Sequence, residues 1–377
     1  MVEVILFFCT ACMLFYGGYL LWNISYFIRL QPAVKKSPSD ALPAVTIIIP
    51  ARNEAQWIGG LLDAILIQSY PADKLQVIVV DDHSEDTTAA IAADKMQGRA
   101  GWQILPLQRP EGNAYKKAAI SQAILHATGD IILTTDADCL AGKDWVLSMI
   151  SAMDAETGLV SGPVQMWDDG GWFQQFQALE FMGLIALGAG SMARNAPNMC
   201  NGANLAYRKE AFYAVDGFTG IDHIASGDDE LLMHKIHSLT SFQVKFQKCP
   251  DAIVSTAPCT TFRQFVNQRI RWVSKSTHYK NYKITLVMSC VYLAILGVPI
   301  ALIVAVFVPQ YAAFPILLFG LKILPESIAL FTATTFFQRQ SLMWRFLPEQ
   351  IVHIPYILWA GMAGNFGKYV WKERKVQ

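Results

Sequence analysis

The chain has 377 residues, and its 30 Lys and Arg are balanced by 30 Asp and Glu, so the formal net charge at pH 7 is zero. A neutral chain has no electrostatic basis for binding nucleic acid, which excludes that class of partner. Hydrophobic residues make up 53% of the chain and charged residues only 16%. Because the apolar residues gather near the two ends, this composition predicts membrane-spanning segments rather than one oversized core.

The first element is an apolar stretch over residues 4–28 that carries no charged side chain. It exceeds the roughly 20 helical residues that cross a hydrocarbon layer. It follows Glu3 instead of a basic region, which favours an uncleaved anchor over a signal peptide. Arg29, Lys35 and Lys36 come next, and this positive charge predicts that the central domain lies in the cytoplasm. With the apolar stretches near the C-terminus, we expect a multi-pass protein of the cell (inner) membrane.

After the anchor (1–28) and a proline-containing linker (29–44), short β-branched runs alternate with helical patterns. Apolar runs that end at polar residues are typical of buried parallel strands. The alternation predicts an α/β domain over residues 45–255, with a mostly parallel sheet that binds ligands beyond the carboxyl ends of its strands. The predicted strands are Val45–Pro50, Gln76–Val80, Trp102–Leu107 and Asp130–Thr134, and the predicted helices are Glu54–Gln68, Thr87–Met96, Ala114–Ala127 and Leu231–Ser238.

Polar residues follow three of these strands. Asp136-Ala137-Asp138 places two carboxylates one residue apart, which can bind a hard divalent cation that also holds the phosphates of a nucleotide. Taken alone, such a motif is more often an ordinary acidic turn. Pro50-Ala51-Arg52-Asn53-Glu54 and Asp81-Asp82-His83-Ser84 end the first two strands, where helix capping and turn formation are the alternative roles.

Two further motifs lie nearer the C-terminus. Gly227-Asp228-Asp229-Glu230 begins a predicted helix and can present a carboxylate that deprotonates a hydroxyl, although an acidic first turn also suits the helix dipole. Gln268, Arg271 and Trp272 stand at i, i+3 and i+4, so on a helix they share one face. Arginine can pair with phosphate oxygens and an indole can pack on a sugar ring, while a helix anchored at a membrane interface is the alternative.

In this order and spacing, the five motifs resemble those of membrane-bound family 2 glycosyltransferases, with a D-x-D and a Q-x-x-R-W motif. The resemblance covers roughly residues 45 to 275. It implies a GT-A (nucleotide-diphospho-sugar transferase) domain flanked by transmembrane helices. It also implies a nucleotide-sugar donor, a UDP- or GDP-sugar, and a divalent metal, Mg or Mn.

The same resemblance assigns roles to residues. It implies that Asp229 is the catalytic base and that Arg271 stabilises the departing diphosphate. It also implies that Asp138 and Asp136 bind the metal. Lys116 stands in Tyr115-Lys116-Lys117-Ala118-Ala119-Ile120, which is similar to the family's G-K-x-x-A-[IL] with Tyr115 in place of glycine. A solvated basic helix end is the alternative there. The donor-binding residues implied are Pro50, Arg52, Glu54, Asp81, Asp82, Lys116 and Asp136, and the acceptor-binding residues are Asn201, Gly202, Asp228, Gln268 and Trp272.

Trp172–Leu187 predicts either an amphipathic helix in the headgroup region or a buried core helix. An interfacial Q-x-x-R-W region (256–283) leads to membrane helices (284–371) and a basic tail (372–377). The three late apolar stretches are Ile284–Val308, Tyr311–Phe337 and Ile351–Val370. If all three crossed the membrane, the basic tail would end outside, against the charge rule. We therefore expect two crossings, with the third stretch re-entrant or interfacial.

Lys322 and Glu326 lie four residues apart within the second of these stretches and are expected to pair. Together the patterns predict an inverting glycosyltransferase that moves a sugar from a nucleotide sugar to a membrane-associated lipid or glycan acceptor, most simply a lipid. Processive polysaccharide synthesis is the alternative activity. A non-catalytic membrane scaffold or transporter is the alternative class, and it would leave the five ordered motifs unexplained.

Overall fold

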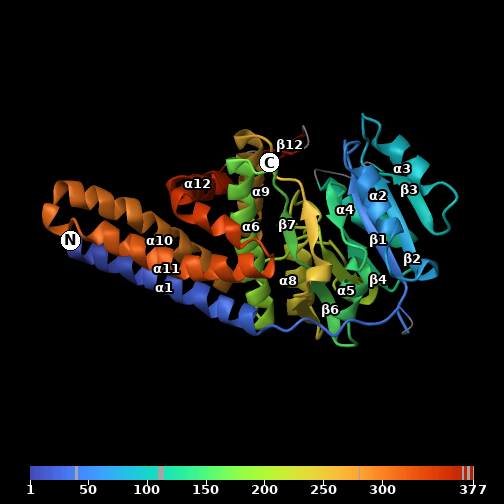
Figure 1. Ribbon diagram of the computed structural model, residues 1–377, viewed down its shortest axis with the longest axis horizontal. Helices are drawn as coiled ribbons and strands as arrows, with labels where there is room; N and C mark the ends of the chain where they lie inside the picture. Colours follow the sequence, from blue (N-terminus) through green and yellow to red (C-terminus); the bar gives the residue numbers. More distant parts are fainter. Residues whose placement is uncertain (39–40, 109–113, 280, 367–368, 372–373, 377) are drawn as a thin grey trace.

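The computed structural model describes residues 1–38, 41–108, 114–279, 281–366, 369–371 and 374–376. An α/β domain lies at one end of the molecule, and a bundle of long apolar helices extends from it (Figure 1). Residues 39–40 of the predicted linker, residue 280 of the predicted interfacial region, and residues 372, 373 and 377 of the predicted tail lie outside the described residues.

A seven-stranded sheet in the order β3-β2-β1-β4-β8-β6-β9 organises the domain. The strands β1, β2, β3 and β4 run parallel, β8 is antiparallel to both β4 and β6, and β6 is parallel to β9. The predicted α/β class and mostly parallel sheet are confirmed. The strands are β1 (Val45–Ala51), β2 (Leu75–Asp81), β3 (Trp102–Pro106), β4 (Ile131–Thr134), β6 (Thr157–Ser161), β8 (Leu205–Arg208) and β9 (Gln243–Phe246).

The centre of this sheet is buried on both faces. Ile47, Ile48 and Ile49 in β1 are fully buried although their side chains point alternately to the two faces. Such strands carry continuous β-branched runs instead of an alternating pattern, which is why the sequence reveals them. The domain helices are α2 (Ile58–Leu66), α3 (Thr88–Met96), α4 (Tyr115–His126), α5 (Trp145–Ser151), α7 (Lys209–Ala214) and α8 (Glu230–Leu239), with 3-10 turns η1 (Ala72–Lys74) and η2 (Pro250–Ala252).

The first domain helix begins four residues later than predicted, at Ile58 instead of Glu54. Asn53 has a left-handed backbone (φ 53°), which ends the strand in a turn. The backbone N–H of Glu54 then donates to the hydroxyl of Thr88, 2.7 Å away, instead of entering a helix.

A second, three-stranded sheet lies beside the binding edge. Its strands are β5 (Cys139–Ala141), β10 (Val254–Thr256) and β7 (Val164–Met166), in that order. The sequence analysis did not predict them, because three-residue strands carry too little pattern to detect. In this sheet β5, which directly follows Asp138, pairs antiparallel with β10.

The membrane-side bundle consists of α1 (Val2–Arg29), α10 (Tyr282–Phe307) and α11 (Phe314–Phe336), with the 3-10 turn η4 (Pro309–Tyr311) between the last two. These helices lie side by side, and the N-terminus sits at the far tip beside the turn that joins α10 to α11 (Figure 1). Small and apolar side chains fill the core between them. The buried residues there are Leu6, Cys9, Cys12, Met13, Ala294, Val298, Ala301 and Leu318.

Four helical segments of the described chain are long and apolar enough to cross a membrane: α1, α6 (Trp172–Ala193), α10 and Pro309–Phe336. The most apolar window of α6 is 67% buried inside the protein, whereas the other three are 28–33% buried. It crosses the domain end of the bundle (Figure 1), and Gly190 leaves no room for a side chain against the backbone of Asn23. Of the two predictions for this region, the buried helix therefore fits better, and it runs six residues longer than expected.

Residues 351–366 of the last predicted apolar stretch lie in α12 (Phe346–Phe366), which follows a 3-10 segment η5 (Gln340–Arg345) and begins five residues earlier than that stretch. Residues 367–368 of the stretch lie outside the described residues, and its last two residues lie in a short strand. Helix α12 lies near α6 at the domain end of the bundle (Figure 1), packed on the Q-x-x-R-W helix α9 (Phe262–Ser274). The hydroxyl of Tyr292 in α10 donates to the carbonyl of Leu358 in α12. The remaining elements are η3 (Lys275–His278), β11 (Tyr369–Trp371) and β12 (Arg374–Val376), the last two paired antiparallel.

The expected pairing of Lys322 with Glu326 is confirmed at 2.7 Å, and both side chains are buried. Tyr16 of α1 donates to the other oxygen of Glu326 at 2.6 Å, and Lys322 also donates to Gln350 of α12 at 2.5 Å. The ion pair therefore joins α1, α11 and α12, which satisfies charges that would otherwise be costly in an apolar bundle.

Candidate functional site

The carboxyl ends of β1, β2 and β4 meet at one edge of the sheet because these strands are parallel neighbours. The Arg52 guanidinium donates to the backbone carbonyls of Asp82 and His83, each at 2.8 Å. It also pairs with Glu85 at 3.1 Å. Arg52 therefore fixes the shape of the loop after β2, which carries Asp82.

One cavity of about 2200 Å³ lies over this edge and continues toward the bundle. It brings together 14 of the 15 site residues that the sequence predicts. The exception is Asp81, whose carboxylate accepts from the backbone N–H of Ser84 at 3.3 Å and shapes the turn. The 14 predicted residues that line the cavity are Pro50, Arg52, Glu54, Asp82, Lys116, Asp136, Asp138, Asn201, Gly202, Asp228, Asp229, Gln268, Arg271 and Trp272.

Lys116 bridges two acidic motifs. Its ammonium group lies 2.7 Å from Asp136 and 3.2 Å from Asp228. Burial acts to lower the pKa of Lys116, but the charges of Asp136 and Asp228 outweigh it and raise that pKa above its usual value. Lys116 is therefore a permanent cation between the D-x-D loop and the start of α8, not the solvated helix end considered as its alternative.

Asp136 and Asp138 both face the cavity, and Asp138 also accepts from the hydroxyl of Thr256 at 3.2 Å. No cluster of three or more His, Cys, Asp or Glu that could hold a metal occurs among the described residues. The protein thus offers two hard carboxylates and no complete cage. This donor set fits Mg²⁺ or a similar ion, which is commonly held by one or two carboxylates together with substrate phosphates.

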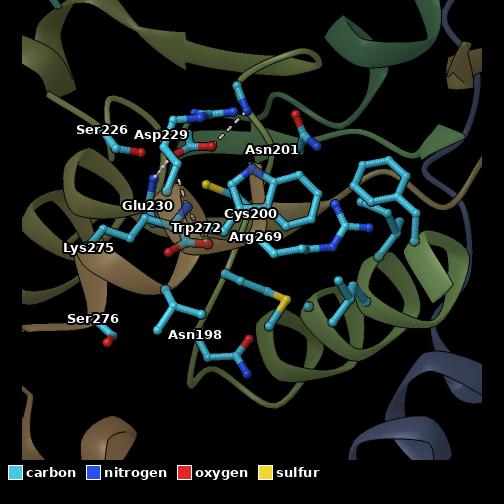
Figure 2. Close-up of a pocket in the computed structure, with 18 of the residues that line it drawn as sticks. Asn198, Cys200, Asn201, Ser226, Asp229, Glu230, Arg269, Trp272, Lys275 and Ser276 are labelled. Atoms are coloured by element: carbon cyan, nitrogen blue, oxygen red, sulfur yellow. Dashed lines mark hydrogen bonds and ion pairs between the residues drawn. The ribbon is translucent and has the colours of Figure 1, made fainter. Parts of the chain in front are cut away.

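Asp229 caps the N-terminus of α8. Its carboxylate accepts from the backbone N–H groups of Glu230 (2.7 Å) and Gly202 (3.0 Å), so it is fixed in place at the cavity wall (Figure 2). Burial acts to raise the pKa of Asp229, but the charges of Lys275 and Lys116, with these two backbone hydrogen bonds, lower it to about 2. Asp229 is therefore ionised at neutral pH.

Lys275 is a site residue that the sequence analysis missed. Its buried ammonium group lies 2.9 Å from Glu230 and 3.7 Å from Asp229 (Figure 2), and Tyr279 donates to the other oxygen of Glu230. A signal was available, because Lys275 follows Gln268 by seven residues and so continues the helical face of Gln268, Arg271 and Trp272.

Lys117 is a second missed residue. Its buried ammonium group donates to the carbonyls of Ile224 (2.5 Å) and Ser226 (2.6 Å), which fixes the loop before Asp228. Burial lowers the pKa of Lys117 to about 8.

The Q-x-x-R-W residues lie on α9, which begins with a capping box at Thr261 and Gln264. Gln268, Arg271 and Trp272 all line the cavity. Among the described residues, no ion-pair partner of the Arg271 guanidinium occurs, so this cation is available to an anionic ligand.

Arg269, also missed, holds this helix in position. It is buried, forms an ion pair with Glu180 of α6, and lies over the ring of Trp272 at 4.2 Å. Phe181 stacks on the same indole at 5.8 Å between centroids. Trp272 is thereby fixed between α6 and α9 with its ring at the cavity (Figure 2).

Comparison with known proteins agrees with this geometry. Residues 46–216 match the sequence profile of glycosyl transferase family 2. An N-acetylglucosaminyltransferase from Rhizobium meliloti (strain 1021) is 29% identical over 253 residues, and a poly-beta-1,6-N-acetyl-D-glucosamine synthase from Staphylococcus aureus (strain COL) is 26% identical over 254 residues. The chain contains a glycosyltransferase family 2 domain.

The matched segments make up 64% and 66% of this chain, and they span only 58% and 59% of the two relatives. The fold is similar to that of a mannosyltransferase, PcManGT from Pyrobaculum calidifontis, solved with GDP-Man and Mn²⁺. The TM-score is 0.62 at 21% identity, over 97% of this chain and 99% of that one. This likeness confirms the GT-A fold of the domain together with its flanking helices.

The buried charge cluster predicts that losing Lys275 destabilises the protein more than losing a lysine with an exposed partner does. Replacing Lys275 by Met should destabilise the protein by about 3–5 kcal/mol, because the buried carboxylates of Glu230 and Asp229 lose their compensating charge. The matched control is Lys245→Met, whose partner Asp154 is exposed, and it should cost no more than about 1 kcal/mol.

Thermal unfolding of the purified proteins in detergent measures the difference. Adding Glu230→Gln to Lys275→Met should recover part of the loss, because one buried charge is removed with its partner. Equal unfolding temperatures for Lys275→Met and Lys245→Met would contradict this interpretation of the cluster.

Proposed function

We propose that the protein is an inverting glycosyltransferase that moves a sugar from a nucleotide sugar to a membrane-associated acceptor, specifically a lipid. The observation that carries this proposal is the single cavity that joins the strand-end carboxylates to walls formed by the bundle helices. A donor bound at the sheet edge and an acceptor held at the membrane can meet in such a cavity without leaving it.

The donor lies at the sheet edge in this proposal. Glu54 and Asp82 contact its base and ribose, and Asp138 with Asp136 would hold a divalent cation on its diphosphate. When bound, such an ion neutralises negative charge on the leaving nucleoside diphosphate. Arg271 supports the same diphosphate from α9 through paired hydrogen bonds. The donor is a UDP- or GDP-sugar, and the names of both relatives make N-acetylglucosamine the first sugar to test.

Asp229 is the general base. It is ionised at neutral pH and can accept the proton of the acceptor hydroxyl as that oxygen attacks the anomeric carbon from the face opposite the diphosphate. The base is weak while Lys116 and Lys275 both act on it. The diphosphate of the donor competes with Asp136 and Asp228 for Lys116, so donor binding should increase the basicity of Asp229.

A lipid acceptor is inferred from the packing of the bundle beyond the cavity, where the described side chains fill the core between the helices. Beyond the cavity, Met13 of α1 and Ala294 of α10 are fully buried in the core between the helices. Leu6, Val298 and Leu318 are buried in the same core. Processive polysaccharide synthesis is the second candidate, and the name of the staphylococcal relative favours it. Family membership argues against the scaffold or transporter class.

The proposed location is the cell (inner) membrane, with the catalytic domain in the cytoplasm. Crossings by α1, α10 and α11 put Arg29, Lys35 and Lys36 on the domain side, as the positive-inside tendency requires. Because α12 then lies at the domain end of the bundle, the chain needs only two crossings after the domain. This agrees with the topology expected from the basic tail.

Replacing Asp138 by Ala should abolish sugar transfer and make nucleotide binding insensitive to Mg²⁺ or Mn²⁺, because one of two metal-binding carboxylates is gone. Calorimetric titration with the nucleoside diphosphate, with and without the metal, measures the binding. Thr256→Ala is the control, since it removes only the hydroxyl that contacts Asp138. Full activity of Asp138→Ala in the presence of a chelator would rule out a metal-assisted mechanism.

Asp229→Asn keeps the size of the side chain but cannot take up a proton, so turnover should fall by about a hundredfold or more while donor affinity changes little. Arg271→Ala should weaken binding of the nucleoside diphosphate as well as turnover, because the guanidinium acts on the diphosphate. Titration of both variants alongside steady-state rates separates these effects. If Asp229→Asn lost donor binding but turned over normally at saturating donor, Asp229 would be a nucleotide ligand and not the base.

A further inference from the structure

The cavity is larger than a donor site requires. Ligand pockets commonly measure about 300–1,000 Å³, and this one measures about 2200 Å³. The donor-binding residues occupy only the edge of the sheet. The remaining volume is lined in part by helices that are apolar enough to cross a membrane. These walls are more apolar than the donor site, which consists mainly of charged and polar residues.

The first helix supplies one wall of this remaining volume. Phe15, Gly18, Tyr19 and Trp22 line the cavity, and their spacing of three to four residues places them on one face of α1. Further lining residues come from α6 and α10, among them Gly188 and Met288.

Polar groups stand between this apolar part and the base. The Tyr19 hydroxyl accepts from Arg194 and from Asn198, each at 3.3 Å, and the Arg194 guanidinium lies 4.6 Å from the centre of the Trp22 ring. Asn198 and Asn201 also line the cavity on the way to Asp229 (Figure 2). A single molecule that fills this volume must therefore be apolar at one end and polar at the other.

We propose that α1, α6 and α10 form a binding site for the hydrocarbon tail of the acceptor lipid, with Gly18 keeping the space that the tail occupies. This proposal rests on the proposed function and extends it, because it makes the N-terminal helix a part of the acceptor site and not only an anchor. The hydroxyl-bearing headgroup then reaches Asp229 past Asn198 and Asn201. The tail remains at the level of the membrane helices, where it exchanges directly with the bilayer.

Gly18 allows a sharp test. A Cβ added there would meet no atom within 4 Å, so a larger side chain can project into the cavity without disturbing the protein. Gly320 on α11 is the matched control, because an added Cβ also meets no atom within 4 Å and the residue does not line the cavity. Leucine at either position also favours a helix more than glycine does.

The full chain is placed in phospholipid nanodiscs with a radiolabelled diacylglycerol that carries a diazirine in one acyl chain. After irradiation, label should appear in the peptides around Phe15–Trp22 and Gly188, and unlabelled diacylglycerol should compete for it while phospholipid does not. Gly18→Leu should reduce this competable labelling by at least about tenfold, a free-energy change on the order of 1.4 kcal/mol. Gly320→Leu should leave it unchanged.

Sugar transfer to the same diacylglycerol is measured in parallel. Absence of competable labelling in the unmodified protein, or equal labelling of Gly18→Leu, would overturn the tail site. Competable labelling without any sugar transfer would leave the tail site in place and refute the proposed function. Transfer that is unaffected by Gly18→Leu would keep the proposed function and refute the tail site.

Discussion

Two lysines, Lys116 and the buried Lys275, hold four acidic side chains together, and the arrangement of the site depends on this balance. Lys116 contacts Asp136 and Asp228, and Lys275 contacts Asp229 and Glu230. Two unit charges 4 Å apart interact by about 4 kcal/mol at the effective dielectric of a protein surface. Without the lysines, these attractive contacts between the D-x-D loop, the start of α8 and the segment after α9 would be lost, and the carboxylates would repel one another.

The balance also couples the sheet edge to the membrane helices. Lys275 lies directly after α9 and shortly before α10, so its contact with Glu230 ties the chain that enters the bundle to α8, the helix that Asp229 caps. Arg269 makes a similar link from α9 to Glu180 of α6. The sheet edge and the apolar side of the cavity are thereby held in one geometry, although they come from distant parts of the chain.

The sequence predicted the parts of the fold that carry a strong local pattern. The strands β1, β2 and β4 are continuous buried runs that end at polar residues, so both the strands and their loops could be located. The antiparallel β8 and the three-residue strands β5, β7 and β10 could not, because their pairing is decided by tertiary contacts.

The site followed the same rule. The predicted site residues, which come from recognisable motifs, line one cavity, with the exception of Asp81. Arg269, Lys117 and Lys275 were missed because their importance lies in partners distant along the chain, such as Glu180 and the carbonyl of Ile224. The charge balance of a cluster depends on the folded state and cannot be read from the sequence. The one sequence signal for Lys275 was its spacing of seven residues from Gln268, which places both on one helical face.

The central claim is that this enzyme transfers a sugar to a lipid at the membrane. The most direct measurement incubates the purified protein in native lipid extract with labelled UDP- and GDP-sugars, and then separates the organic-soluble fraction from material retained as polymer. The account predicts that label from one donor enters the organic phase in a product with a single added sugar, and that Asp229→Asn abolishes it. Label found only in polymer, or in neither fraction with any donor, would contradict the account.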